Sequence, residues 1–253
     1  MKEVNKQDLP EYTFAVAGHV YGHSQRFTRS VYPPFLKKMK EDIDQFEIQF
    51  LVLTGDVVPF PDSANWGKAN TELNELGIDW FVAPGNHDYG SVMQDITGKS
   101  DHIAFKKDSD LFLVLNTTHA GWTLDSLQID FVKNQMSQID SVENIFVFTH
   151  QLWWLHNTPA EYNLLRIDTN SDALFNGEKD FWSDAFEIFA AADKNTWFFA
   201  GDLGAHEVFK SYYEDHHENF HFYGSGMGSG INDNYLLVSV FKDGSVTVIK
   251  REF

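Results

Sequence analysis

The chain of 253 residues contains no cysteine. Disulfides, thiolate nucleophiles and cysteine-ligated zinc are therefore excluded, although this absence does not fix a compartment. There is also no run of about 18 apolar residues, so no membrane-spanning helix is predicted. The segment Met1–Glu11 is polar and lacks the apolar stretch of a signal peptide. We expect a soluble protein, cytoplasmic by default, and periplasmic or secreted if the chain has been trimmed.

Basic residues are scarce as well. The 19 Lys and Arg face 37 Asp and Glu, which gives a formal net charge of −18. A field of this sign repels polyanions, and the sequence has no Lys/Arg cluster large enough to offset it. Long nucleic acid is therefore not an expected partner. Most of the acidic residues are explained by solvation of the surface, and a smaller part by attraction of cations.

Short apolar runs alternate with amphipathic segments along the chain. The predicted strands are Thr13–Ala17, Phe50–Leu53, Trp80–Ala83, Leu111–Leu115, Ile145–Phe148, Trp197–Ala200, Tyr235–Phe241 and Ser245–Ile249. The predicted helices are Pro33–Phe46, Ala64–Leu76, Leu124–Ile139 and Glu178–Asp193. Strands that are apolar on both faces indicate an α/β fold with covered sheets. No repeat, linker or low-complexity segment interrupts residues 1–253, so we predict a single domain.

Polar side chains stand where several of these strands end. They are His19, Asp56, Asn86-His87-Asp88, His150 and Asp202. Taken alone, Gly85-Asn86-His87-Asp88 is equally well explained as a surface turn, because Asn, His and Asp favour turns. In α/β sheets, however, ligands bind outside the carboxyl ends of the strands, where all these side chains would converge. Imidazoles, carboxylates and one amide suit Mn, Fe or Zn, and a pair of such ions suits displacement at phosphorus.

Three segments carry a family resemblance: Phe50–Asp56, Gly85–Asp88 and Thr149-His150, each after a strand and in this order. Together with the glycine-rich Gly224–Gly230, they resemble the calcineurin-like metallophosphoesterase superfamily from about Tyr12 to the end of the chain. The resemblance implies a four-layer α/β/β/α sandwich, in which two mixed sheets are flanked by helices. It also implies hydrolysis of a small phosphomonoester or phosphodiester by a metal-activated hydroxide, with one or two divalent or trivalent ions.

The same resemblance implies individual roles. Asp56 would be the carboxylate shared by the two ions, and Asn86 and His150 would ligate the second ion. His87 would lie over the phosphate as general acid or transition-state donor, with Asp88 orienting its imidazole.

The first and last motifs depart from the family pattern. His19 stands where the family has Asp, and Tyr21 stands where it has His. Asp202 and Gly204 likewise occupy the positions of two histidines. The exchange at His19 and Asp202 leaves the summed ligand charge unchanged, which favours retained metal binding.

The second ion keeps Asp56, Asn86, His150 and Asp202 as ligands. The first ion has His19 and Asp56, with Tyr21, His23 and His206 as further candidate ligands.

Other polar and aromatic residues have two interpretations each. Arg166, in a long predicted loop over residues 151–177, could pair with a phosphate or be a solvated surface residue. Trp153 and Trp154 could wall the pocket, although we expect packing for one of them. His119 is expected in a turn. His216, His217 and His221 are expected in a polar loop that leads into a strand.

Two further functions remain open from the sequence. Tyr21 and Gly204 are compatible with a degenerate scaffold that binds or regulates and holds one metal or none. A mixed His/Asp shell with a tyrosine also suits an iron-containing oxidase or a hydrolase of non-phosphate substrates.

Overall fold

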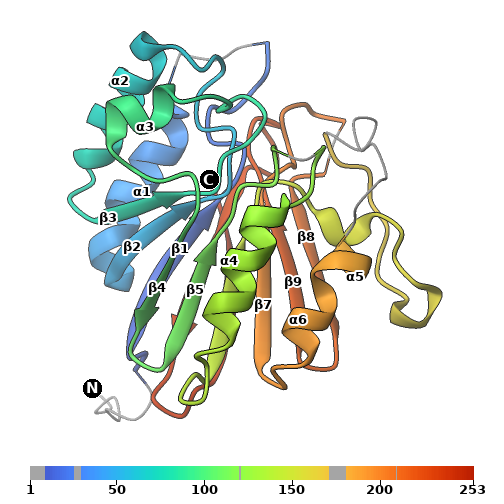
Figure 1. Cartoon of the computed structure of the whole chain (residues 1–253). Coiled ribbons are helices and arrows are strands. Elements are labelled where there is room, and N and C mark those ends of the chain that lie inside the picture. The colour runs from blue at the N-terminus through green and yellow to red at the C-terminus, as the bar shows by residue number, and fades with distance from the viewer. Residues whose placement is uncertain (1–8, 26–29, 120, 171–180, 209) are drawn as a thin grey trace.

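The computed structural model describes residues 9–25, 30–119, 121–170, 181–208 and 210–253. Two β-sheets face each other (Figure 1). The first sheet has, in spatial order, β11 (Val246–Glu252), β10 (Asn234–Val240), β1 (Tyr12–Ala17), β2 (Ile48–Leu53) and β3 (Asp79–Val82). Strands β1, β2 and β3 are parallel, and β10 and β11 extend this sheet antiparallel.

The second sheet has a parallel centre and antiparallel edges. Its order is β4 (Ile103–Lys107), β5 (Asp110–Val114), β6 (Asn144–Phe148), β7 (Asn195–Ala200), β9 (Phe220–Ser225) and β8 (Tyr212–His217). Strands β5, β6, β7 and β9 are parallel, whereas β4 and β8 pair antiparallel at the two edges.

Helices cover the outer face of each sheet. The helices α1 (Pro33–Phe46), α2 (Ser63–Asn74) and α3 (Val92–Thr97) pack on the first sheet. The second sheet is covered by α4 (Ser126–Met136), α5 (Phe181–Asp184), α6 (Phe186–Ala190) and the 3-10 turn η2 (Trp153–Leu155). A further 3-10 turn, η3 (Ala160–Tyr162), lies in the loop after η2. The expected α/β/β/α sandwich of two mixed sheets is therefore confirmed (Figure 1).

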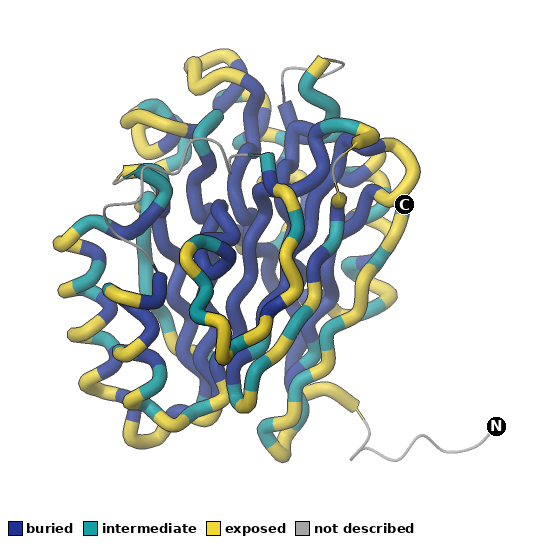
Figure 2. Tube along the Cα trace, turned by 90° about the vertical axis from the view of Figure 1, so that its right-hand side faces the viewer, coloured by how far each residue is buried: buried dark blue, intermediate teal, exposed yellow. Residues whose placement is uncertain are grey.

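Phenylalanine fills the space between the sheets. Phe14 and Phe50 of the first sheet stack with ring centroids 5.0 Å apart, and Phe14 meets Phe146 of the second sheet edge-on at 5.3 Å. These rings are buried, and Figure 2 shows the strands as largely buried segments with exposed residues on the outer helices and loops. This rigid apolar layer fixes the two sheets relative to each other, and with them the loops at their ends.

Several predicted elements need correction. Residues 178–193 were expected as one helix, but Ala185 leaves helical geometry at φ −120° and separates α5 from α6, while residues 178–180 lie outside the described residues. His216, His217 and His221 are not in a loop: the first two lie in β8 and the third in β9. Strands β4 and β8 carry charged and half-exposed residues, because an edge strand has one neighbour and solvent beside it.

Within the described part of the chain, no helix combines the length and the apolar character that crossing a bilayer requires.

Candidate metal centre

The centre lies where strands of both sheets end. His19 follows β1, Asp56 follows β2 and Asn86 follows β3 in the first sheet. His150 follows β6 and Asp202 follows β7 in the second. Since β1–β3 are parallel to one another, and β6 is parallel to β7, the carboxyl ends within each sheet lie at one edge. Both edges contribute to the same site.

The backbone at this edge is strained and closely packed. His19 and Asp56 have φ values of 49° and 52°, in the left-handed region that side-chain-bearing residues rarely occupy. Such residues cost about 1–3 kcal/mol each and gather at functional sites. Gly55 and Gly85 permit the close approach, because a Cβ at Gly55 would lie 2.3 Å from Nδ1 of His150, and one at Gly85 would lie 2.3 Å from Oδ1 of Asp56.

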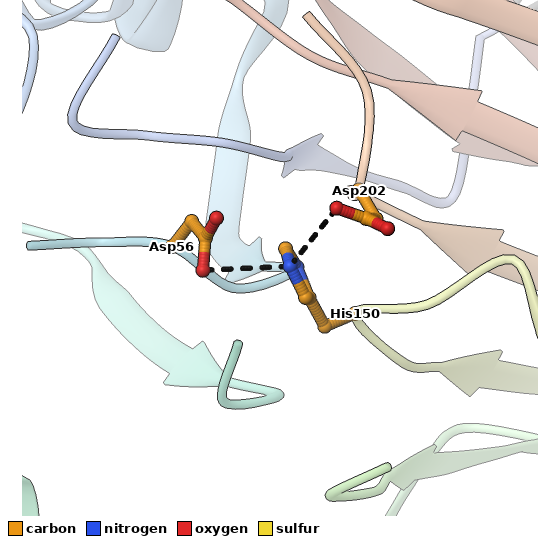
Figure 3. A group of neighbouring side chains, drawn as sticks. All are labelled: Asp56, His150 and Asp202. Atoms are coloured by element: carbon orange, nitrogen blue, oxygen red, sulfur yellow. Dashed lines mark ion pairs between the residues drawn. The ribbon is translucent and has the colours of Figure 1, made fainter. Parts of the chain in front are cut away.

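Asp56, His150 and Asp202 point toward one another (Figure 3). Their ligand atoms all lie within 4.8 Å of one another, and the three side chains are buried. Nε2 of His150 is 3.4 Å from Oδ1 of Asp56 and 3.5 Å from Oδ1 of Asp202. Atoms that share one ion at bonds of about 2.1 Å lie about 3.0–3.6 Å apart. The spacing therefore fits ligands of a common ion.

His150 is oriented for coordination. Its Nδ1 lies 2.8 Å from the carbonyl oxygen of Thr54, which can only accept, so Nδ1 carries the proton. The lone pair of Nε2 is therefore directed at the carboxylates, and this backbone contact is of the kind that fixes metal-binding histidines. Nε2 of His150 and Oδ1 of Asn86 are buried and have no hydrogen-bond partner among the described residues. A bound ion would satisfy both atoms.

Burial dominates the electrostatics of the site. It raises the pKa of the Asp56 carboxyl, against the opposing charge and backbone N–H of His87. Burial, followed by repulsion from Asp56, likewise raises the pKa of Asp88. The pKa of His19 falls to about 3, because burial is reinforced by His150 and His87. A neutral His19 beside buried carboxylates is the state that metal coordination requires.

His87 lies beside the carboxylate of Asp56. Its backbone N–H donates to Oδ1 of Asp56 at 3.1 Å, and its Nδ1 is 2.9 Å from the carbonyl oxygen of Pro59. Nδ1 is therefore the donor, and Nε2 is the nitrogen that takes up or releases a proton. Nε2 is 3.4 Å from the hydroxyl of Tyr21, whose pKa is raised by burial.

Asp88 has a different role from the expected one. Its carboxylate accepts hydrogen bonds from the backbone N–H groups of Val57, Val58 and Gly85. The carbonyl oxygen of Pro59 orients the His87 imidazole instead. Asp88 thus ties the loop after β2 to the loop after β3, and with it the backbone that carries Asp56 and Asn86.

Two further candidates, His23 and His206, face each other with ring centroids 5.5 Å apart, and His206 contacts Ser24. Arg166 lines a cavity of about 700 Å³ with His156, Asp168 and Lys210, and no described ligand of the centre lines it.

The two tryptophans are packing residues. Trp153 and Trp154 are fully buried and pack on Phe181 and Phe222, respectively. His119, at the end of a turn, pairs with Asp101 at 3.0 Å.

The groups that orient the two central imidazoles could not be predicted from the residue types. Thr54 and Pro59 act through their carbonyl oxygens, which every residue has, so the residue types carry no signal.

The chain matches a known protein family over the segment that contains this centre. The family model of calcineurin-like phosphoesterases matches residues 19–224. The chain belongs to the calcineurin-like phosphoesterase family. Members of this family use divalent metals, and the matched segment contains every residue of the centre described above.

Solved phosphoesterase structures share the fold. A dimetal phosphatase from Danio rerio matches with a TM-score of 0.58 and 13% identity, over 96% of both chains. A putative 5'-nucleotidase from Staphylococcus aureus matches with a TM-score of 0.53 and 11% identity, over 95% of this chain and 53% of that one. At these identities the likeness concerns the fold. No curated protein matches the chain.

Proposed function

We propose that this protein is a metal-dependent hydrolase of small phosphomonoesters or phosphodiesters. One observation carries the proposal: Asp56, His150 and Asp202 present buried ligand atoms within 4.8 Å of one another at the edge where the two sheets meet. Membership in the calcineurin-like phosphoesterase family supports the same reaction class.

The protein groups have separable tasks. Asp56, Asn86, His150 and Asp202 would hold the metal, which supplies Lewis-acid activation of water and neutralises charge at the phosphoryl group. Thr54 keeps the Nε2 lone pair of His150 directed into the centre. Asp88 holds together the two loops that bear these residues.

His87 is the proposed proton donor. Its Nδ1 is held by Pro59, and its backbone N–H by Asp56, so the imidazole has a fixed position at the centre. With the proton on Nδ1 bound to the Pro59 carbonyl, Nε2 carries a proton only in the imidazolium form of His87. In that form it would donate this proton, or a hydrogen bond, to an oxygen of the phosphoryl group or to the departing oxygen, and His87 would be left as the neutral imidazole. A positioned general acid of this kind contributes about 10²–10⁴-fold in rate.

Two p-nitrophenyl esters of phosphate test the proposal. Chelator-treated protein reloaded with Mn²⁺ should hydrolyse p-nitrophenyl phosphate or its bis ester. The variant Asp56→Asn should show no turnover, because it removes a charged ligand without changing side-chain volume. Asp130→Asn on the exposed face of α4 is the matched control and should retain full activity. Equal turnover by wild type and Asp56→Asn would refute the proposal.

A binding or regulatory scaffold is the second candidate. It is motivated by Gly204, which brings no side-chain ligand and instead forms a backbone bridge with Met227. This candidate requires a folded wild-type protein that hydrolyses neither ester with any divalent metal.

A further inference from the structure

The carboxylate of Asp56 faces a different histidine with each of its oxygens. Oδ1 lies 3.4 Å from Nε2 of His150, and Oδ2 lies 3.5 Å from Nε2 of His19. An ion could therefore be placed on either side of Asp56. The surroundings of the two sides differ.

The Oδ1 side is built as a metal site. Asp202 lies beside His150, and Oδ1 of Asn86 is buried without a hydrogen-bond partner among the described residues. The Thr54 carbonyl holds the His150 tautomer that coordination requires. Ligand atoms and a supporting contact are both in place.

The Oδ2 side lacks these features. Nδ1 of His19 is buried and has no hydrogen bond of good geometry within the part of the chain that is described, although the backbone of His19 and of Gly22 acts on the imidazole. The Tyr21 ring packs on His19 with ring centroids 4.5 Å apart, and its hydroxyl lies 3.4 Å from Nε2 of His87, so a tyrosine stands on this side where Asn86 and Asp202 stand on the other. Gly204 is held by Met227 and Lys210 through its backbone and adds no side-chain donor.

The donor atoms on the Oδ1 side are mainly oxygen. Asp56, Asn86 and Asp202 each offer an oxygen, and His150 offers the nitrogen. Carboxylate and carbonyl ligands suit Mg²⁺ and Mn²⁺, whereas additional imidazole ligands shift a site toward Zn²⁺.

We propose that the protein holds one ion, bound by Asp56, Asn86, His150 and Asp202, and that Asp202 biases this site toward Mn²⁺ or Mg²⁺ and away from Zn²⁺. The proposal rests on the metal site of the proposed function. In this proposal Asp202 determines which metal the site prefers. His19 lies beside the site and does not bind a second ion.

Metal counting and metal competition test this proposal. Stripped wild-type protein is dialysed against Mn²⁺ or Zn²⁺, and the bound ions per chain are counted by mass spectrometry. Dissociation constants for both metals are then measured by calorimetry on wild type, Asp202→His and the matched control Asp130→His. We expect one tightly bound ion in wild type. In Asp202→His the ratio of Zn²⁺ to Mn²⁺ affinity should rise by roughly tenfold or more, and in the control it should not change.

Two tightly bound ions per wild-type chain, or an unchanged affinity ratio in Asp202→His, would overturn the proposal. If Asp202→His does not fold, Asp202→Asn replaces it and should weaken Mn²⁺ binding by roughly tenfold. Unweakened Mn²⁺ binding in that variant would count against the assignment of Asp202. None of these measurements uses turnover, so an inactive protein with one Mn²⁺ would contradict the proposed function and leave the metal assignment standing.

Discussion

At the residue scale, the centre depends on which nitrogen of each imidazole is free. His150 and His87 both direct Nδ1 at a backbone carbonyl, of Thr54 and Pro59 respectively, so both keep Nε2 available. For His150 that nitrogen faces carboxylates and suits metal binding. For His87 it lies near the Tyr21 hydroxyl and suits proton transfer. The same local arrangement would thus serve two tasks in the proposed function, and the neighbours of Nε2 would decide which task each histidine performs.

Replacement of His87 separates these tasks. His87→Ala should lower kcat by about 10²–10⁴-fold, because the proton donor is lost. Its affinity for Mn²⁺, measured by calorimetry, should stay within about threefold of wild type, because the side chain is not a ligand. A variant that loses metal and activity together would show that His87 belongs to the metal site instead.

The raised pKa of Asp56 predicts how pH affects the metal-free protein. The pKa of this carboxyl is about 6 in the folded chain against 3.8 when unperturbed, because burial disfavours the charge. A raised pKa stabilises the fold fully below about pH 4, and this stabilisation is lost as the pH rises through about 6. The free energy of unfolding is measured by urea denaturation in the presence of chelator, for wild type and for Asp56→Asn. Between pH 4 and pH 7 the free energy of unfolding of wild type should fall, relative to that of Asp56→Asn, by an amount on the order of a few kcal/mol. A relative gain in stability over this range would contradict the assignment.

At the element scale, the apolar strands could be predicted, including β3 and β11 at the edges of the first sheet, whereas the polar edge strands β4 and β8 could not. Pro33–Phe46 was expected as a helix and is one, because prolines begin it and apolar residues such as Phe35 and Met39 recur on one face. Strand β8 was missed because its residues, Tyr212–His217, are polar and half-exposed at the sheet edge. In Gly224–Gly230 the first residues still belong to β9, and the turn proper is held by Asp233, which accepts from the N–H groups of Gly228, Ser229 and Gly230.

An ion pair between buried Asp42 and part-exposed Arg251 joins α1 to the end of the first sheet. Asp42 of α1 accepts two hydrogen bonds from Nη2 of Arg251 in β11, at 3.0 and 2.9 Å, and another from the hydroxyl of Tyr235 in β10. Asp42→Ala should therefore reduce the free energy of unfolding by about 1–3 kcal/mol, because it leaves the buried hydroxyl of Tyr235 without its acceptor. Asp44→Ala on the exposed face of the same helix should change it by less than about 0.5 kcal/mol in the same denaturation experiment. Equal effects of the two variants would show that the contacts of Asp42 add nothing.

At the scale of the whole molecule, the site exists because two sheets meet. Asp56 comes from one sheet, and His150 and Asp202 come from the other, so the phenylalanine layer between them sets the distances within the centre. The sequence predicted which strand ends carry the polar side chains that the structure brings together at the centre, because buried strands are apolar and their polar ends stand out. It could not predict that Tyr21 lies near His87 or that His23 faces His206, because those contacts depend on loop conformation.

The central claim is that the cluster of Asp56, His150 and Asp202 is a metal centre that hydrolyses phosphoesters. The most direct test is a titration of chelator-stripped protein with Mn²⁺. Turnover of bis(p-nitrophenyl) phosphate and of p-nitrophenyl phosphate is measured at each Mn²⁺ concentration. Wild type and His150→Ala are compared. Turnover of one or both esters by wild type should rise from background and saturate with added Mn²⁺, and His150→Ala should stay at background throughout. Folded wild-type protein that remains at background with both esters, or His150→Ala that follows the wild-type curve, would contradict the claim.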